Sequence, residues 1–191
     1  MNQKTIRAFI AVELDNQAKN IVRQVQNSLK KSEADVKWVM PENCHLTLKF
    51  LGDTTSADIE QIKTAMPKAC DGFSTFSITI KQIGAFPRIE SPRIIWIEAL
   101  SEDDIVKKLA GSIEDELEKL GFEKENRTFK SHVTIGRVRS PRNRTALKDA
   151  LKKHVLESNL KQKVTRIKLF KSTLTPKGPE YEELFSAELK V

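Results

Sequence analysis

The sequence predicts an α+β fold with largely antiparallel sheets, built as two similar lobes that face each other across a central cleft. Segments with strand periodicity and segments with helix periodicity follow one another irregularly along the 191 residues, without the regular βα alternation of a parallel sheet. A His-x-Thr-x pattern occurs at His45 and again at His132, 87 residues later (132 minus 45), which is close to half the chain. We therefore expect residues 1–191 to form a single domain with two lobes and with helices on the outside.

The first half of the chain contains four expected strands and two expected helices. An apolar, β-branched run is typical of a buried strand, and apolar residues at helical spacing follow it. Pro41 ends a short strand, Gly52-Asp53 is expected to end the next one, and Ser56 is expected to cap a helix. The expected strands are Thr5–Leu14, Val36–Met40, Cys44–Leu51 and Phe73–Ile83, and the first helix is Asn16–Lys31.

The second half contains four more expected strands and two more helices. A loop is expected around Pro87 and Pro92. Apolar residues at helical spacing predict a helix from Ser101 to Leu120, and Ser140-Pro141 is expected to open a basic helix that ends near His154. The expected strands are Arg93–Ala99, His132–Arg139, Gln162–Thr173 and Tyr181–Lys190, with Pro176, Gly178 and Pro179 in the last turn.

The composition excludes several classes of protein. Apolar residues make up 39% of the chain and charged residues 31%, as in a soluble globular protein. No apolar run approaches the roughly 18–20 residues of a membrane span, and we identify no secretory leader. Two cysteines, Cys44 and Cys70, exclude a disulfide scaffold and a four-cysteine zinc site, and they fit a reducing cytoplasm. We expect a cytoplasmic monomer with no membrane partner, no metal and no cofactor.

The positive charge is concentrated in one window of the sequence. Residues 126–177 contain 15 Lys and Arg against two acidic residues, so this window carries +13 and the rest of the chain −6, for a total of +7. Such asymmetry favours a surface that binds a polyanion. A solvated helix face and edge strand would have the same composition, and the charge alone does not decide between the two interpretations.

The two His-x-Thr-x strands carry the chemistry. Residues i and i+2 of a strand lie on one face, so His45 lies with Thr47, and His132 with Thr134, while the residues between them point into a core. An imidazole can take or give a proton near neutral pH, and a hydroxyl can donate to a phosphate oxygen without adding charge. Two such strands across a cleft provide what metal-free in-line displacement at phosphorus requires.

These residues resemble the 2H phosphoesterase superfamily, and most closely the RNA 2′,3′-cyclic phosphodiesterases, also called 2′-5′ RNA ligases. The resemblance runs through the chain. It rests on the segments Arg7–Leu14, Trp38–Gly52, Gly84–Pro87, Pro92–Trp96 and His132–Arg137, of which the second and the last hold the two motifs. Ser131 departs from the family, where proline is common, but it lies outside the catalytic pattern.

The resemblance implies a bilobal 2H phosphoesterase fold and hydrolysis of a terminal 2′,3′-cyclic phosphate on RNA to a 2′-phosphate. It also implies reversible 2′-5′ ligation of tRNA halves, without ATP or metal. His45 and His132 would be catalytic, and Thr47 and Thr134 would bind phosphate. We assign His132 as the base for water and His45 as the acid for the leaving 3′-oxygen, an assignment that stays open because coupled groups can exchange roles.

Two more residues are assigned to substrate binding by the resemblance. Arg137 would neutralise phosphate charge, although strict alternation puts it on the face opposite His132 unless a bulge near Gly136 redirects it. Phe50 would stack on the terminal base, although Phe50-Leu51 is also typical of a buried strand.

Three other functions remain as alternatives. A second 2H activity would act on nucleotide cyclic phosphates or 2′-5′ oligoadenylates. A non-catalytic RNA-binding module would need only the basic window. A metallohydrolase fits least, since two separated histidines without nearby acidic ligands are a poor metal set.

Overall fold

The computed structural model describes residues 4–154, 156, 160–176 and 178–191. The helices are α1 (Asn16–Lys30), α2 (Ser56–Ala69), α3 (Ile105–Glu118) and α4 (Arg144–Lys153), with 3-10 turns η1 (Pro41–Asn43) and η2 (Glu102–Asp104). The strands are β1 (Thr5–Glu13), β2 (Val36–Trp38), β3 (His45–Thr55), β4 (Phe76–Arg88), β5 (Ser91–Ser101), β6 (His132–Val138), β7 (Lys161–Val164), β8 (Arg166–Thr175) and β9 (Gly178–Glu188).

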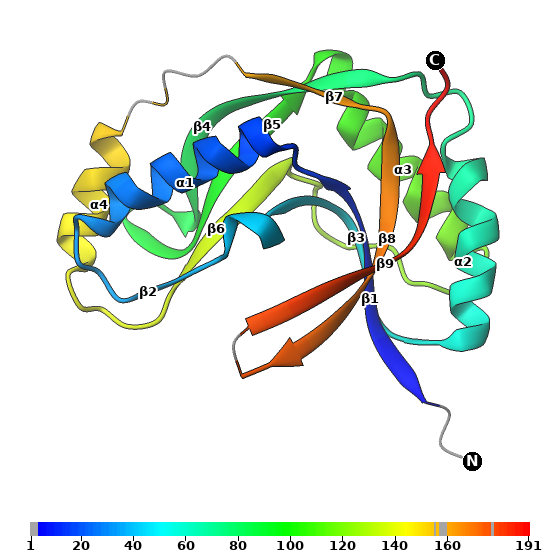
Figure 1. Ribbon diagram of the computed structural model, residues 1–191, viewed down its shortest axis with the longest axis horizontal. Helices are drawn as coiled ribbons and strands as arrows, with labels where there is room; N and C mark the ends of the chain where they lie inside the picture. Colours follow the sequence, from blue (N-terminus) through cyan, green and yellow to red (C-terminus); the bar gives the residue numbers. More distant parts are fainter. Residues whose placement is uncertain (1–3, 155, 157–159, 177) are drawn as a thin grey trace.

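The strands of the described residues form one curled antiparallel sheet with a symmetric order. The order is β7-β4-β5-β6-β3-β1-β8-β9, and β2 pairs with β6 beside this path. Three strands extend outward from β6 and three from β3, so each motif strand begins its own half of the sheet (Figure 1). The predicted α+β fold with two similar, largely antiparallel lobes is confirmed.

Helices cover the outer surface of each lobe (Figure 1). α2 and α3 pack against each other and against β3, whereas α1 packs against α4, which lies against β5. α3 buries residues at helical spacing (Val106, Leu109, Ala110, Ile113 and Leu117), which is the apolar stripe expected from its sequence. Within the part of the chain that the structure describes, no helix has the length and apolar character needed to cross a membrane.

The first motif strand is longer than predicted. Gly52 was expected to end it, but β3 continues to Thr55 because Gly52 adopts a φ of +70°, which lets the backbone turn without breaking the pairing of Gly52 with Ala8 of β1. The cap of α2 is consequently Thr55 rather than Ser56. The hydroxyl of Thr55 accepts from the backbone N–H of Asp58, whose carboxylate accepts in return from the backbone N–H of Thr55.

Several other predicted boundaries are wrong for local reasons. Pro87 and Pro92 lie inside β4 and β5, where they face each other at the end of a tight hairpin. The predicted helix from Ser101 begins with the 3-10 turn η2, because Asp103 and Asp104 have positive φ values and α3 starts only at Ile105. The basic helix α4 begins at Arg144, and the strand expected over Gln162–Thr173 is divided at Thr165 into β7 and β8.

Gly84 gives a direct test of this packing. It is the cross-strand partner of Trp96, and a Cβ at Gly84 would lie 2.2 Å from Cζ2 of the buried indole. We predict that Gly84→Ala lowers the free energy of unfolding by about 1–3 kcal/mol, the usual cost of overpacking a core. Gly111→Ala in α3 is the control, since its Cβ would meet no atom within 4 Å and alanine favours a helix. Urea unfolding that shows equal stability for Gly84→Ala and the parent protein would contradict this packing.

Candidate active site

The two His-x-Thr-x motifs meet where the lobes join. Leu46 of β3 pairs with Val133 of β6 in antiparallel register, and both side chains are fully buried. Antiparallel pairing then sets His45 across from Thr134, and Thr47 across from His132, on the opposite face of the sheet. Directly opposed residues have Cβ atoms about 4.5–5.5 Å apart. The imidazole of each motif therefore lies beside the hydroxyl of the other.

Both imidazoles are held in the same tautomer by the same local contact. Nδ1 of His45 lies 2.8 Å from the carbonyl oxygen of Asn43, and Nδ1 of His132 lies 2.6 Å from that of Lys130. A carbonyl oxygen only accepts, so each Nδ1 carries the proton and donates it. The Nε2 atom of each ring consequently keeps its lone pair for proton transfer.

Aromatic side chains enclose each imidazole. The His45 ring stacks on Phe9 at 4.6 Å between centroids, and Tyr181 meets it edge-on at 5.2 Å. The His132 ring meets Phe86 edge-on at 5.0 Å and lies 6.3 Å from Trp96. The aromatic partners fix the ring planes, so that rotation about the side-chain bonds is restricted in both lobes.

This enclosure keeps both imidazoles neutral in the free protein. Burial lowers the pKa of His45 to about 4, while the hydrogen bond to Asn43 opposes the shift. Burial also lowers the pKa of His132, and the positive charges of Lys130 and Arg137 lower it further, while the hydrogen bond to Lys130 opposes the shift. At neutral pH each ring is therefore a base with a free Nε2, and an anion in the cleft would favour its protonated form.

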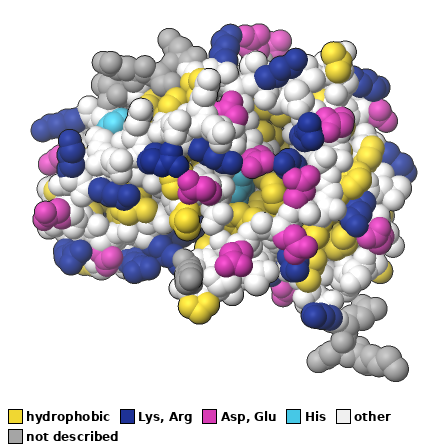
Figure 2. Space-filling model, in the orientation of Figure 1, with side chains coloured by type: hydrophobic (Ala, Val, Ile, Leu, Met, Phe, Trp, Pro, Cys, Tyr) yellow, Lys and Arg dark blue, Asp and Glu magenta, His cyan; other side chains and the backbone are white. Residues whose placement is uncertain are grey.

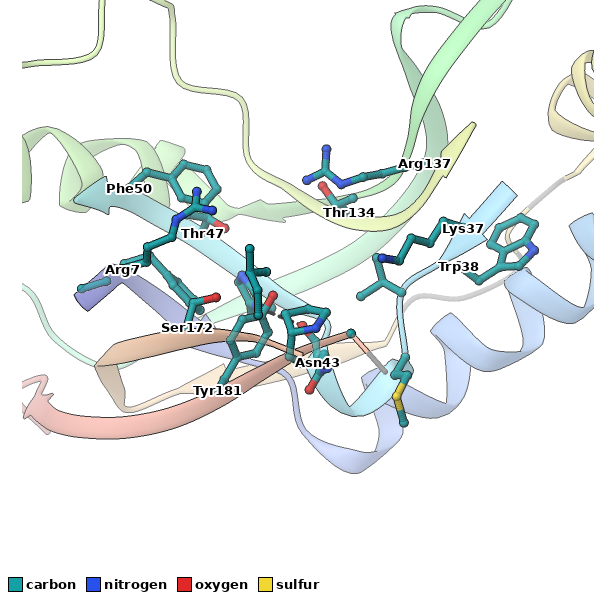
Figure 3. A pocket seen from close by; sticks show the side chains of 18 of the residues that line it. Arg7, Lys37, Trp38, Asn43, Thr47, Phe50, Thr134, Arg137, Ser172 and Tyr181 are labelled. Carbon is teal, nitrogen blue, oxygen red and sulfur yellow. Dashed lines mark hydrogen bonds between the residues drawn. The ribbon is translucent and has the colours of Figure 1, made fainter. Parts of the chain in front are cut away.

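A cavity of about 440 Å³ opens at this junction (Figure 3). Five of the six predicted site residues line it: His45, Thr47, Phe50, Thr134 and Arg137. His132 is not part of the lining, and its ring contacts Phe86 and Trp96. The walls come from β1, β3, β6, the segment from β2 through η1, and the β8–β9 hairpin.

A bulge in each motif strand turns the fifth residue after the histidine into the cleft. The register of β3 against β1 shifts at Leu48, and that of β6 against β5 shifts at Ile135. After each shift the alternation reverses, so Phe50 and Arg137 are exposed on the side of the cavity. The bulge considered near Gly136 is thus present one residue earlier, and a matching bulge explains why Phe50 is 63% exposed rather than in the core.

The cavity is positively charged. Arg7, Lys37 and Arg137 contribute to its lining, and no Asp or Glu does among the described residues. Within the ranges that the structure covers, no group of three His, Cys, Asp or Glu side chains is arranged to hold a metal ion. The side chains present match an anionic ligand.

Apolar side chains form the mouth of the cavity. Four large hydrophobic residues are strongly exposed in the described chain, and three of these, Met40, Phe50 and Leu174, line this cavity. Figure 2 shows hydrophobic side chains and a histidine in the middle of this face, surrounded by charged side chains of both signs. A cavity lined by both exposed apolar and cationic side chains suits a ligand with both bases and phosphates.

Part of the charge of the basic window is paired with acidic residues of neighbouring strands. In β8, Lys168 pairs with Glu13 and Glu183 at 2.6 and 2.7 Å, and Lys171 pairs with Glu182 at 2.8 Å. Much of the charge of this strand is thus neutralised by β1 and β9, whereas Arg137 at the other end of the window faces the cavity.

Most other residues of the lining are not predicted from the sequence, among them the polar residues Arg7, Lys37, Asn43, Ser172 and Tyr181. Alternation in β1 could have indicated Arg7, which shares the face of Phe9. Trp38 is half-buried and also lines the cavity. Tyr181 comes from the last strand, and nothing in its local sequence places it against His45.

Cys44 does not take part in the site. Its thiol is buried and points toward the carbonyl oxygen of Thr134 at 3.6 Å, away from the cleft. Burial raises its pKa to about 12, so the thiol stays protonated and unreactive.

Comparison with known proteins agrees with this geometry. Residues 12–96 and 99–181 match the family described as LigT like Phosphoesterase. An RNA 2′,3′-cyclic phosphodiesterase of Methanothermobacter thermautotrophicus is 35% identical over 94% of this chain and 96% of its own length. One of Archaeoglobus fulgidus is 36% identical over 94% of this chain and 98% of its own length.

Solved structures share the fold. The protein TT0787 of Thermus thermophilus superposes with a TM-score of 0.81 at 24% identity, covering 97% of this chain and 98% of that one. E. coli LigT in its apo form gives 0.77 at 20% identity, covering 98% and 99%. The chain therefore belongs to the LigT-like phosphoesterase family of the 2H superfamily, as its motifs predict, and it is an enzyme of the phosphoesterase class.

The tautomer and pKa of each histidine are directly measurable. We predict that at pH 7 both rings are neutral with the proton on Nδ1. Because a lowered pKa delays protonation on acidification, His45 should remain neutral down to about pH 5 and His132 should titrate below 6.5. Two-bond ¹H–¹⁵N correlation spectra across a pH series report both properties. A proton on Nε2, or a ring already charged at pH 7, would contradict the geometry.

Proposed function

We propose that this protein hydrolyses the terminal 2′,3′-cyclic phosphate of RNA to a 2′-phosphate. The observation that carries the proposal is the pair of Nδ1-protonated imidazoles, His45 and His132, set on adjacent strands beside two threonine hydroxyls and a cationic cavity. The names of the curated relatives support RNA as the substrate class. The chemistry needs no metal and no cofactor, because the two rings can supply both proton transfers.

The reaction is an in-line displacement at phosphorus. One imidazole takes a proton from water as the water oxygen bonds to phosphorus. The bond from phosphorus to the 3′-oxygen breaks, and the second ring, as imidazolium, gives its proton to that oxygen. The hydroxyls of Thr47 and Thr134 donate to the non-bridging oxygens, and Arg137 balances their charge. The products are a 2′-phosphate and a free 3′-hydroxyl.

The order of side chains across the cleft supports His132 as the base and His45 as the acid. His132 lies across from Thr47, on the side of Phe50, whereas His45 lies across from Thr134, on the side of Arg137. In a ribose, C2′ adjoins the carbon that bears the base, and C3′ adjoins the carbon that leads to the 5′ end. With the base on Phe50, the 3′-oxygen is directed toward His45, and in-line water approaches from His132.

The same step would join RNA ends when a ribose 5′-hydroxyl replaces water. The oxygen attacks phosphorus, the 3′-oxygen leaves with a proton, and a 2′-5′ phosphodiester results. We include this reversible ligation, with tRNA halves as its substrates, in the proposal. We also propose that the protein is monomeric and cytoplasmic and that residues 1–191 form a single domain.

The decisive experiment measures turnover of a short RNA that ends in a 2′,3′-cyclic phosphate, in EDTA, with the product isomer identified. We expect a 2′-phosphate, and we expect His45→Ala and His132→Ala each to lower kcat by about 10²–10⁴-fold, the usual share of general acid–base catalysis. His154→Ala is the matched control, since His154 bonds Ser28 at the end of α4 and lies outside the site. Full activity in both site variants, or loss of activity with EDTA, would refute the proposal.

A substrate panel in the same assay separates the alternatives. Faster turnover of nucleotide cyclic phosphates or 2′-5′ oligoadenylates than of RNA ends would indicate the second type of 2H activity. Salt-sensitive RNA binding without any turnover would indicate a non-catalytic module.

The assignment of acid and base has its own test. A substrate with sulfur in place of the bridging 3′-oxygen releases a thiolate, which needs no proton from the enzyme. We predict that this substitution restores most of the rate lost in His45→Ala and little of that lost in His132→Ala. Single-turnover rates measure the effect, and rescue of His132→Ala alone would reverse the assignment.

A further inference from the structure

Lys37 lies beside Arg137 at one end of the cavity. The two residues are cross-strand partners where β2 pairs with β6. Both side chains are exposed and both line the cavity, and Figure 3 shows them on the same side of it, opposite Phe50. Lys37 is thus part of the site but removed from the two histidine–threonine pairs.

This arrangement of charges is unfavourable without a ligand. Like charges directly opposite each other in a sheet destabilise it. Among the described residues, no carboxylate lies within 4.0 Å of the Lys37 ammonium or the Arg137 guanidinium, whereas Lys168 and Lys171 of β8 have acidic partners. A second cation beside Arg137 therefore indicates more negative charge here than one phosphate brings.

The geometry of a nucleotide indicates which of its groups would lie near Lys37. The 2′,3′-cyclic phosphate lies on one edge of the ribose, and the base and C5′ leave from C1′ and C4′, at opposite ends of that edge. When the base stacks on Phe50 and the cyclic phosphate lies between Thr47 and Thr134, C5′ is directed away from Phe50. The opposite end of the cavity is where Lys37 and Arg137 lie.

We propose that Lys37 binds the phosphate on the 5′ side of the terminal nucleotide. The inference rests on the proposed hydrolysis of cyclic phosphate ends and adds a specificity-determining residue to it. Arg137, next to Thr134, binds the reacting cyclic phosphate, and Lys37 binds the phosphate on the 5′ side of the same nucleotide. The site consequently prefers an RNA chain, or a nucleotide with a 5′-phosphate, to a cyclic nucleotide with a free 5′-hydroxyl.

The test compares two substrates that differ only in that phosphate: uridine 2′,3′-cyclic phosphate with a 5′-hydroxyl and the same compound with a 5′-phosphate. We expect Lys37→Gln to lower kcat/KM about tenfold for the 5′-phosphorylated substrate, and by less than about twofold for the other. On a short RNA, the slope of log(kcat/KM) against log[salt] should become shallower by about 0.7, as for the loss of one phosphate contact.

Two further variants control the experiment. Lys37→Arg keeps the charge and should retain the preference for the 5′-phosphate. Lys81→Gln removes an exposed lysine of β4 that does not line the cavity. This variant should leave kcat/KM unchanged for both substrates.

The outcomes separate this inference from the proposed function. An equal loss on both substrates would place Lys37 at the reacting phosphate and overturn the inference, as would no loss on either. In both cases turnover by the parent protein would leave the proposed function standing. A parent protein that hydrolyses neither compound nor the RNA would overturn the proposed function and this inference with it.

Discussion

The antiparallel pairing of Leu46 with Val133 is the contact on which the rest of the site depends. It joins the two halves of the sheet, and both side chains are buried completely. Because alternate residues of a strand face opposite ways, burying this pair brings an imidazole and a hydroxyl from each strand to the other face. A one-residue slip between the strands would separate each histidine from the threonine across from it.

The two halves of the site share a backbone and differ in side chains. Each histidine bonds the carbonyl two residues before it, and each strand has a bulge three residues after it. The residues that the bulges expose are Phe50 in one half and Arg137 in the other. This difference makes the two ends of the cleft unequal, since the exposed ring of Phe50 lies at one end, with Arg7 beside it, and Arg137 lies with Lys37 at the other (Figure 3). A nucleotide has the same polarity, with a base at one end and a phosphate at the other.

Sequence periodicity was sufficient for the fold class and for placing the two motifs on strands. The alternation around His45 and His132, and the repeat of the motif near half the chain, depend only on local pattern, and the structure keeps both. The bulges at Leu48 and Ile135 cannot be recognised in the alternating sequence of these strands, so the placement of Phe50 and Arg137 could not be decided from alternation. Lys37 lies beside Arg137 because β2 pairs with β6, and Tyr181 reaches the cavity from the last strand, so only the strand pairing brings these two residues there. The predicted ends of strands and helices were wrong where the backbone departs from regular geometry, as at Gly52 and Asp103, which have positive φ values.

The proposed mechanism requires the two imidazoles to act as one unit, since a proton must leave water and another must reach the 3′-oxygen in a single displacement. The most direct measurement is a double-mutant cycle on an RNA that ends in a 2′,3′-cyclic phosphate, with kcat determined for His45→Ala, His132→Ala and the double variant. We expect the double variant to be slower than the slower single variant by less than about tenfold, because either substitution already disables the unit. Losses in kcat that multiply would show two groups that act independently and would contradict this mechanism.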